Sequence, residues 1–362
     1  MVEDDEALPQ PRMLGEALRR SHEQVKGRDV LKLRFPTVVN RRFRIGLAFL
    51  LALAGMPAVS SAQDSYPNRL IKIVVPFPSG TTAELIPRLV AEKLSARWGQ
   101  PVIIETRPGA TGNIGAEAVA VAEPDGYTLL SSAPPPLVVN QNLYSKLSFD
   151  PAAFVPVSLM AVVPNVLVAR KDLPAGNLLE LIALSKRKPE ELTYGSTGPG
   201  GTPQLTMEML KIASGANLRD IPYRQGTAPV LTDLLGGRID TMFINISDVL
   251  PHIRSGALKA FGVATEKRIS QLPDVPAIAE SFPGFYSATW YAMMAPPRTP
   301  PEIAAKLSAA IMDILKTTDA GTKLRAQSMI IVAATPAETA AFLKQEIERW
   351  RGVIKAAGIK VE

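Results

Sequence analysis

Two stretches of this sequence end a strand-like run with glycine, proline and hydroxyl residues and then begin a helix-like run. In the first, Ile-Lys-Ile-Val-Val at 71–75 is followed by Pro-Phe-Pro-Ser-Gly-Thr at 76–81. In the second, a strand at 192–194 precedes Gly-Ser-Thr-Gly-Pro-Gly-Gly-Thr at 195–202. A helix that starts directly after such a loop leaves backbone N–H groups unpaired, and such groups bind anions. The two loops therefore predict an anion site that needs no charged side chain.

Capping residues mark where the two helices should begin. Thr81 with Glu84 three residues later predicts a capping box, and Thr202 followed by Pro203 predicts an N-cap with proline at the first helical position. The second loop matches neither the Walker nor the dinucleotide glycine pattern, so an ordinary glycine-rich turn is the alternative interpretation. Its position before a helix, which repeats that of the first loop, favours two helix N-termini that clamp a carboxylate.

Residues for catalysis are scarce. The chain has no cysteine and two histidines, His22 and His252, and no Gly-x-Ser-x-Gly motif. A lone histidine beside apolar residues, such as His252, is more often packing or surface than a catalytic base. Glu346 and Glu348 lie among basic residues of a C-terminal helix, which is typical of a solvated face. No metal-ligand spacing occurs. We therefore expect no catalytic residue, no metal and no cofactor.

The charge of the chain is mildly basic and gives no sign of nucleic-acid binding. The formal net charge is +6 over 362 residues, and residues 1–62 contribute ten Lys/Arg against seven Asp/Glu. The remainder therefore carries only +3, without a Lys/Arg run interleaved with aromatic residues.

The N-terminal region has the pattern of an export signal. Arg-Arg-Phe-Arg at 41–44 precedes an apolar run of about fifteen residues and then Ser-Ser-Ala at 60–62. A transmembrane anchor is the alternative, but a bilayer needs about 20 apolar residues. We expect a signal peptide over 41–62, cleaved near Ala62, and a periplasmic protein. Residues 1–40 are either a disordered extension or the product of a misassigned start codon.

Strands and helices alternate along the rest of the chain, which predicts an α/β fold. We expect strands at 71–75, 102–105 and 127–131, helices at 82–96 and 116–122, and a long apolar run at 154–168 that Pro164 divides. A second alternation runs to a strand at 258–264, and helices at 301–317 and 336–357 finish the chain. The prediction is two lobes, 63–165 with 265–362 and 166–264, each a mixed, mostly parallel sheet flanked by helices, with a cleft between them.

Five motifs, in order, resemble the Bug family, the TctC-like periplasmic solute-binding proteins of tripartite tricarboxylate transporters. They are Val-Val-Pro-Phe-Pro-x-Gly at 74–80, Arg-Pro-Gly-Ala-x-Gly-Asn-Ile-Gly at 107–115, Pro-Asp-Gly-Tyr-Thr-Leu-Leu at 124–130, Pro-Tyr-Arg at 222–224 and Asp-Leu-Leu-Gly-Gly-Arg-Ile-Asp at 233–240. The resemblance covers nearly all of 66–360. It implies a Venus-flytrap fold of the type II periplasmic-binding class, a small carboxylate ligand, and integral-membrane permease subunits as partners.

In that family, backbone amides and ordered waters of the two loops hold the ligand carboxylate. Carried onto this chain, the resemblance gives as ligand-binding residues Phe77, Ser79, Gly80, Thr81, Ser132, Ser196, Thr197, Gly200, Gly201, Thr202, Tyr223, Gly226 and Asn245. The chain departs from the family pattern at several positions. Gln204 stands where histidine is common, Gln225 resembles an insertion, and Ile244 stands where aspartate is frequent. The change at Ile244 favours a plain carboxylic acid over an amino acid as ligand.

Together these features predict an exported, monomeric carboxylate-binding protein without catalytic activity that serves a tripartite tricarboxylate-type transporter. Two alternatives from other classes stay open. One is an exported hydrolase or isomerase of a carboxylated substrate, with Ser79, Ser196 or Glu84 as catalyst. The other is a sensor component that presents its ligand to a signalling kinase.

Overall fold

The computed structural model describes residues 66–360, so the predicted signal peptide at 41–62 and the segment 1–40 lie outside the described residues. Within that range, no helix is both long and apolar enough to cross a membrane.

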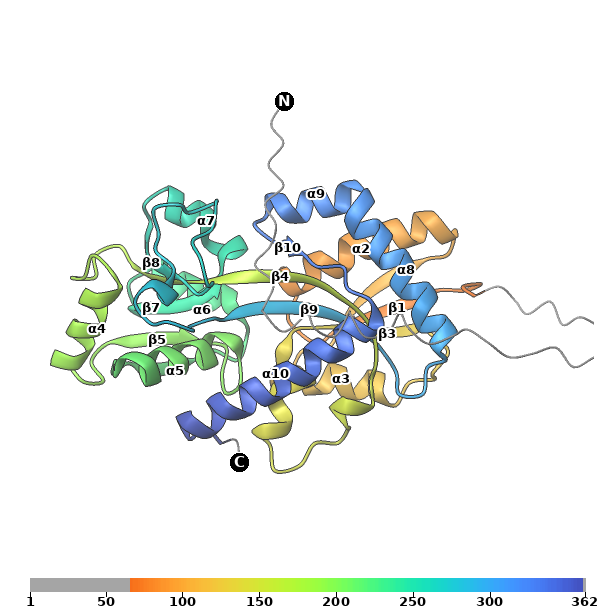
Figure 1. Ribbon diagram of the computed structural model, residues 1–362, viewed down its shortest axis with the longest axis horizontal. Helices are drawn as coiled ribbons and strands as arrows, with labels where there is room; N and C mark the ends of the chain where they lie inside the picture. The colour runs from red at the N-terminus through yellow and green to blue at the C-terminus, as the bar shows by residue number, and fades with distance from the viewer. Residues whose placement is uncertain (1–65, 361–362) are drawn as a thin grey trace, which may run out of the picture. The chain divides into compact units, whose positions relative to one another are not determined.

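The chain begins with three parallel strands alternating with helices (Figure 1). In order these elements are β1 (Ile71–Val75), α2 (Thr82–Trp98), β2 (Val102–Thr106), α3 (Asn113–Ala120) and β3 (Thr128–Ser132). Four of the five β1 side chains are buried, as its β-branched composition predicts. Pro76 and Pro78 follow β1 and cannot donate to a neighbouring strand, which explains why the ladder ends at Val75. The prediction for this region is confirmed within one to three residues.

A single long strand, β4 (Val155–Arg170), links the two halves of the sheet. The prediction that Pro164 divides this run into two strands is wrong, since the 16 residues form one strand. Up to Pro164 the strand pairs with β9 (Ala288–Ala295), and from Asn165 onward it pairs with β7 (Thr241–Asn245). The missing N–H of Pro164 therefore falls where β4 changes partners, and this is how a proline is tolerated inside it.

The second alternation of helices and strands gathers at the opposite end of β4 (Figure 1). It comprises α4 (Leu178–Arg187), β5 (Thr193–Ser196), α5 (Thr202–Ser214), β6 (Arg219–Pro222), α6 (Thr227–Leu235), β7, α7 (Ile246–Arg254) and β8 (Leu258–Val263). β9 then returns the chain to the first group, where α8 (Pro301–Thr317), α9 (Asp319–Ala326), β10 (Ile330–Ile331) and α10 (Pro336–Ala357) complete it. The predicted bounds of α8 and α10 are confirmed, whereas α9 and β10 were not predicted. Short helical turns lie at Ala110–Gly112, Pro135–Val139, Asn140–Asn142, Pro151–Ala153 and Ile278–Glu280.

The strands form a mixed sheet in the order β2-β1-β3-β9-β4-β7-β5-β6, with β8 and β10 also paired to β4. Strands that alternate with helices, β1 to β3 and β5 to β7, pair in parallel. Every antiparallel pair among the described strands involves β4 or β9, the two strands that run between the halves. The two-lobed α/β fold is confirmed, and its parallel pairs are confined to the outer strands of each lobe.

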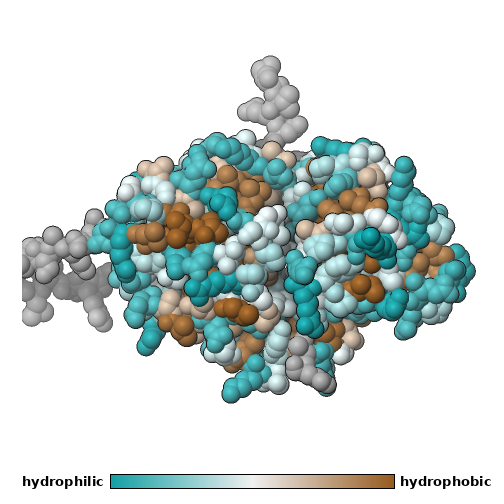
Figure 2. All heavy atoms as spheres, turned by 180° about the vertical axis from the view of Figure 1, so that it is seen from behind, coloured by the Kyte–Doolittle hydropathy of each residue, from teal (hydrophilic) through white to brown (hydrophobic). Residues whose placement is uncertain are grey.

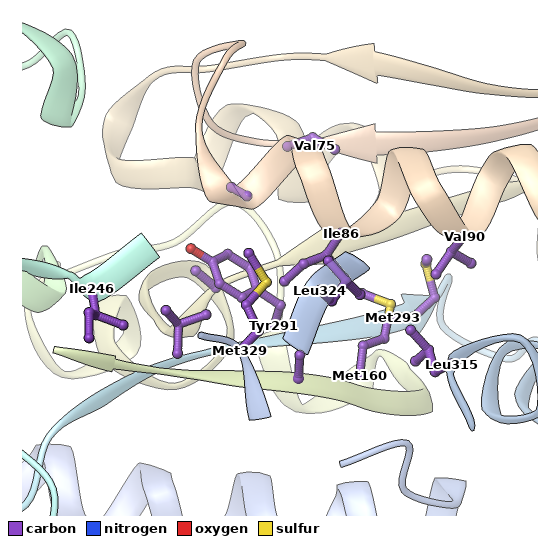
Figure 3. Packing of buried hydrophobic residues seen from close by; sticks show 14 of the residues in the cluster. Val75, Ile86, Val90, Met160, Ile246, Tyr291, Met293, Leu315, Leu324 and Met329 are labelled. Carbon is purple, nitrogen blue, oxygen red and sulfur yellow. The ribbon is translucent and has the colours of Figure 1, made fainter. Parts of the chain in front are cut away.

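A large apolar core lies between α2 and the strands β4 and β9 (Figure 3). Ile86 and Val90 of α2 pack there with Met160, Met293 and Tyr291, and every one of these side chains is at most 3% exposed. Tyr291 belongs both to this core and to the lining of the cavity described below. The core thus fixes one wall of that cavity.

The C-terminal helix α10 packs against β9 through Glu346, an acid that the sequence analysis predicts to lie on a solvated face. Glu346 is only 6% exposed, so that prediction is wrong. Its Oε2 accepts hydrogen bonds from the indole N–H groups of Trp290 (2.7 Å) and Trp350 (3.0 Å). The two buried indoles need an acceptor, and Glu346 supplies it.

The surface is mainly hydrophilic between separate apolar patches. On the face seen in Figure 2, hydrophobic residues form several small groups divided by polar ones. Scattered apolar residues of this kind are normal on a folded protein and carry no functional conclusion.

Candidate functional site

A cavity of about 400 Å³ lies where the first and second groups of strands meet. Its lining comes from the loops that follow β1, β2, β3, β5 and β6, from the first turns of α2 and α7, and from β4, β7 and β9. Ligands of open α/β sheets bind outside the carboxyl ends of the strands, which is where these loops lie. The cavity is therefore in the position that the two-lobe prediction gives to the binding cleft.

Five helices begin at this cavity. Their N-cap residues all line it, namely Thr81 of α2, Gly112 of α3, Gly201 of α5, Gly226 of α6 and Asn245 of α7. None of the five helices has a side chain that caps its first turn. Of the other described helices, α4, α9 and α10 have side-chain caps, whereas α8, whose N-cap Pro300 also lies outside the lining, has none. First-turn N–H groups that no cap residue satisfies are available to an anion, and the helix dipoles reinforce the attraction.

The loop before α2 is braced by Glu84 in a way that the sequence did not predict. Glu84 Oε2 accepts from the Gly80 N–H (2.7 Å), and Thr81 Oγ1 donates to the Pro78 carbonyl. The predicted capping box between Thr81 and Glu84 is therefore wrong. The pKa of Glu84 is lowered mainly by the hydrogen bond from the Gly80 N–H and further by Arg88. Burial acts in the opposite direction, and the net shift is downward.

The loop before α5 has the same construction with a neutral side chain. Gln204 Oε1 accepts from the Gly200 N–H (2.9 Å), and its Nε2 donates to Asp220 (2.9 Å). Gly201, not Thr202, is the N-cap, so the prediction of a Thr202 cap is wrong as well. In both loops a side chain four residues further on occupies a glycine N–H that would otherwise be free for a ligand.

The structure brings seven of the thirteen predicted ligand-binding residues to the cavity and leaves six outside its lining. The seven are Phe77, Thr81, Thr197, Gly201, Thr202, Gly226 and Asn245, and the six are Ser79, Gly80, Ser132, Ser196, Gly200 and Tyr223.

The six outside have other positions or partners. Ser132 and Ser196 are fully buried; Ser132 donates to the Ala133 carbonyl and Ser196 accepts from the Gly198 N–H. Tyr223 donates to Asp233. Ser79 and Gly80 are exposed, and Gly80 lines a smaller neighbouring hollow instead.

Several cavity residues were not predicted. They include the loop 108–112, which lies in the second family motif, and several polar side chains of α2, β4, β9, α7 and the turn after β6: Thr82, Asn165, Arg224, Asp248, Thr289 and Tyr291. Arg224 could have been predicted from the sequence, since it belongs to the Pro-Tyr-Arg motif at 222–224 and directly follows the predicted Tyr223. The other five come from elements that meet only in the folded chain.

Hydrogen bonds join the two lobes around the cavity. Thr82 Oγ1 of α2 donates to Asp248 Oδ1 of α7 (2.7 Å), and Asn245 Nδ2 donates to the Tyr291 hydroxyl (3.2 Å). On another side, an ideal Cβ on Gly200 would lie 2.4 Å from Leu143 Cδ1, so this glycine permits close packing of the two lobes. The contacts enclose the cavity between the lobes.

Opposite charges meet in the lining. Arg224 is the single Lys/Arg residue there and Asp248 the single Asp/Glu residue. Ile244, on β7, does line the cavity, but Asp248, four residues further along the chain on α7, provides a carboxyl group there, so the site still contains an acid despite the replacement of an aspartate at Ile244. Burial raises the pKa of Asp248, against hydrogen bonds from Thr82 and Ser247 that lower it.

The arrangement supports binding better than chemistry. The alternative catalysts Ser79, Ser196 and Glu84 do not line the main cavity, and neither does His252. Over residues 66–360 no group of His, Asp and Glu side chains is placed to hold a metal ion.

Comparison with known proteins gives a consistent picture. Residues 86–359 match the model of the tripartite tricarboxylate transporter family receptor. Protein BugT of Bordetella pertussis is 38% identical over 319 residues, which are 87% of this chain and 97% of BugT. The structure of R. palustris Rpa4515 with adipate superposes with a TM-score of 0.78 at 36% identity, covering 82% of this chain and 99% of that one. The periplasmic binding protein BugD superposes with a TM-score of 0.76 at 33% identity, covering 82% and 100%.

Proposed function

Because the chain belongs to the tripartite tricarboxylate transporter receptor family, whose members are periplasmic solute-binding proteins, we propose that it captures a small carboxylate in the cavity between its lobes. The observation that carries the proposal is the convergence of five helix N-termini without side-chain caps on one cavity. Such N-termini favour an anion. The adipate in Rpa4515, a structural relative, is an anion of this class.

The two lobes would share the ligand. Thr81 and Gly112 come from the first lobe, whereas Gly201, Gly226 and Asn245 come from the second. We place the boundary between the lobes at residues 166 and 264. Since each lobe supplies only part of the donors, a carboxylate binds more tightly when both lobes face it, and binding favours the closed arrangement.

The rest of the proposal concerns transport. We propose that a signal peptide over 41–62 directs export, that the mature protein is a monomer, and that it delivers its ligand to the membrane subunits of a tripartite tricarboxylate-type transporter. Family membership supports the last of these steps, delivery to such a transporter. Loss of uptake of the identified ligand in a deletion strain, restored by the gene, is the expected result.

A thermal-shift screen with isothermal titration of the hits tests ligand capture. The panel contains mono-, di- and tricarboxylates, aromatic acids and the corresponding amides. A carboxylate present at 100 times its Kd stabilises by about 2.7 kcal/mol, which raises Tm by about 5–10 °C. Amides should give no shift because they lack the negative charge. A panel in which no carboxylate raises Tm, or in which the amides do so equally, contradicts the proposal.

A matched pair of arginine variants locates the site. Arg224→Gln removes the positive charge of the lining, whereas Arg219→Gln removes an exposed charge from β6 that does not line the cavity. Arg224→Gln should weaken carboxylate binding about 5- to 30-fold, corresponding to about 1–2 kcal/mol for a hydrogen bond to a charged group. Arg219→Gln should leave the Kd within about twofold. An equal increase in Kd for the two variants would mean that only the overall charge of the protein affects binding, and it would contradict a site at Arg224.

A further inference from the structure

The loop 197–201, between β5 and α5, forms one wall of the main cavity, and every residue of it except Gly200 lines that cavity. Neighbouring side chains hold two of its backbone N–H groups. Ser196 Oγ accepts from the Gly198 N–H (3.2 Å), and Gln204 Oε1 accepts from the Gly200 N–H (2.9 Å). Both side chains belong to residues that are at most 9% exposed, so water hardly competes for these bonds, which restrict the shape of the loop.

One carboxyl group lies behind these two side chains. Asp220, in the edge strand β6, accepts at Oδ2 from Gln204 Nε2 (2.9 Å). Its Oδ1 is removed from solvent and has no hydrogen-bond partner among the described residues. Burial raises the pKa of Asp220, and hydrogen bonding to Ser196 and Gln204 opposes this shift without cancelling it. This acid therefore takes up a proton at a higher pH than an exposed aspartate does.

The other ionisable groups near Asp220 come from β5 and α5. Glu208 raises the pKa of Asp220, whereas Lys211 lowers it. Glu208 accepts from the Tyr194 hydroxyl (2.9 Å) and from Lys211 Nζ (2.8 Å). Lys211 thus forms its ion pair with Glu208 and does not neutralise Asp220 directly.

The ionisation state of Asp220 decides how the Gln204 amide can be oriented. An ionised carboxylate only accepts hydrogen bonds, so it holds Nε2 towards Asp220 and Oε1 towards the Gly200 N–H. A protonated carboxyl group can also donate, and it then permits the reversed amide, with Nε2 against the Gly200 N–H. Two donors cannot bond to each other, so the reversed amide leaves the Gly200 N–H without its acceptor.

We propose that Asp220 is a positioning residue for carboxylate capture, which in its ionised form orients Gln204 and thereby holds the loop 197–201 in its binding shape. Asp220 does not line the cavity and acts through Gln204. The inference rests on the proposed function, because this loop leads into α5, one of the helices whose N-termini are proposed to attract the carboxylate. Affinity should therefore fall when Asp220 is protonated. Direct repulsion between Asp220 and the ligand would give the opposite sign.

Nuclear magnetic resonance with ¹⁵N-glycine labelling tests the coupling without a ligand. The Gly200 amide signal should shift between pH 7.5 and pH 4.5 in the wild-type protein. It should not shift in Asp220→Asn, because an asparagine amide carries both a donor and an acceptor at every pH. The exposed Gly256 is the internal control and should keep its position. A Gly200 signal that does not move with pH in the wild-type protein overturns the inference.

Isothermal titration with succinate, glutarate and citrate over the same pH range measures the effect on affinity. The readout is the Kd of Asp220→Asn divided by the wild-type Kd, since ionisation of the ligand and of other cavity groups cancels from this ratio. We expect a ratio of about 3–10 at pH 7.5, the effect of about one hydrogen bond, and a decrease as the pH falls. Asp274→Asn changes an exposed aspartate outside the lining and should give a ratio near 1 throughout.

The same change in a Gln204→Leu background shows whether Asp220 acts through Gln204. There Asp220→Asn should alter the Kd by less than about twofold, because no amide is left to orient, and circular dichroism at each pH checks that the variants are folded. A ratio that stays constant with pH, a ratio below 1 at pH 7.5, or an undiminished effect in Gln204→Leu overturns the inference and leaves carboxylate capture intact. If no carboxylate binds the wild-type protein, carboxylate capture fails and this inference fails with it.

Discussion

The side chain of Gln204 offers a sharp test of how the second loop is held. Its Oε1 accepts from the buried Gly200 N–H and its Nε2 donates to Asp220, both at 2.9 Å. Gln204→Leu keeps the size of the side chain and removes both bonds. It leaves one backbone N–H without an acceptor and one half-buried acid without its amide donor.

The structure sets the size of the effect. An unsatisfied buried N–H costs about 1–3 kcal/mol, and a hydrogen bond to a charged group is worth about 1.5–3 kcal/mol. The extra apolar surface of leucine returns about 1 kcal/mol. We expect a net loss of about 2–4 kcal/mol in the free energy of unfolding. This corresponds to a decrease in Tm of about 5–12 °C.

The effect should also depend on pH. Burial raises the pKa of Asp220, while Ser196 and Gln204 lower it. Without Gln204 the folded-state pKa of Asp220 rises further, and an acid whose folded pKa is raised destabilises the fold as pH rises through that pKa. The loss caused by Gln204→Leu should therefore become smaller as the pH falls, because Asp220 needs the amide donor less as its carboxyl group becomes protonated.

Urea unfolding followed by circular dichroism measures these differences, with the m-value as a check that the same surface unfolds. Gln141→Leu is the matched control, because Gln141 makes only a 3.5 Å contact with the Val138 carbonyl. Its cost should be below about 0.5 kcal/mol. If Gln204→Leu costs no more than Gln141→Leu, Gln204 does not brace the loop and the reasoning is refuted.

Three further predictions use other parts of the chain. Glu346→Ala leaves both buried indole N–H groups without an acceptor and should lower the free energy of unfolding in urea by about 3–5 kcal/mol. Glu346→Gln keeps an acceptor oxygen and should lower it by about 1 kcal/mol. Equal losses for the two variants would contradict this prediction. The Arg268 guanidinium and a backbone N–H lower the pKa of Glu280 from 4.5 to about 2. Its stabilisation is therefore complete above pH 4.5 and lost as pH falls through 2, so Glu280→Gln should flatten the acid side of the stability profile. Gly201→Ala places a Cβ 2.1 Å from Thr197 Oγ1 in the cavity lining and should weaken carboxylate binding. The added Cβ of Gly80→Ala meets no atom within 4 Å, so this variant should only lose stability. The loss should be about 1 kcal/mol, because alanine is strained at the φ of +77° that Gly80 adopts.

Local signals in the sequence predicted the elements well where those signals are complete. The predicted bounds of α8 and α10 agree with strong local signals, since each helix has proline in its first turn and Thr335 with Glu338 forms a capping box at the start of α10. A β-branched run followed by proline is the corresponding signal for β1. The short elements α9 and β10 carry no comparable signal.

Properties that depend on distant partners were not predicted. The residues around Glu346 predict a solvated acid, because its partner Trp290 lies 56 residues away in the sequence and contacts it only in the folded chain. Asp248 meets Thr82 across 166 residues, and no local spacing reveals that. The braces of the two loops did have a local signal, since an acceptor side chain lies four residues after Gly80 and after Gly200. The capping-box pattern uses a spacing of three residues and therefore does not describe these contacts.

The continuity of β4 determines how the two lobes can move. A loop hinge rotates freely about a few backbone angles, but β4 enters both lobes as one strand of 16 residues and carries ladder hydrogen bonds on both sides of Pro164. Relative motion of the lobes must therefore bend and twist this strand. We expect the strand to resist this deformation elastically and to favour its undeformed shape. The bend concentrates at Pro164, where the backbone lacks a donor and the pairing partner changes, because deformation breaks the fewest hydrogen bonds there. If the lobes close on a ligand as proposed, we expect the movement to be a flexure of β4 centred on Pro164.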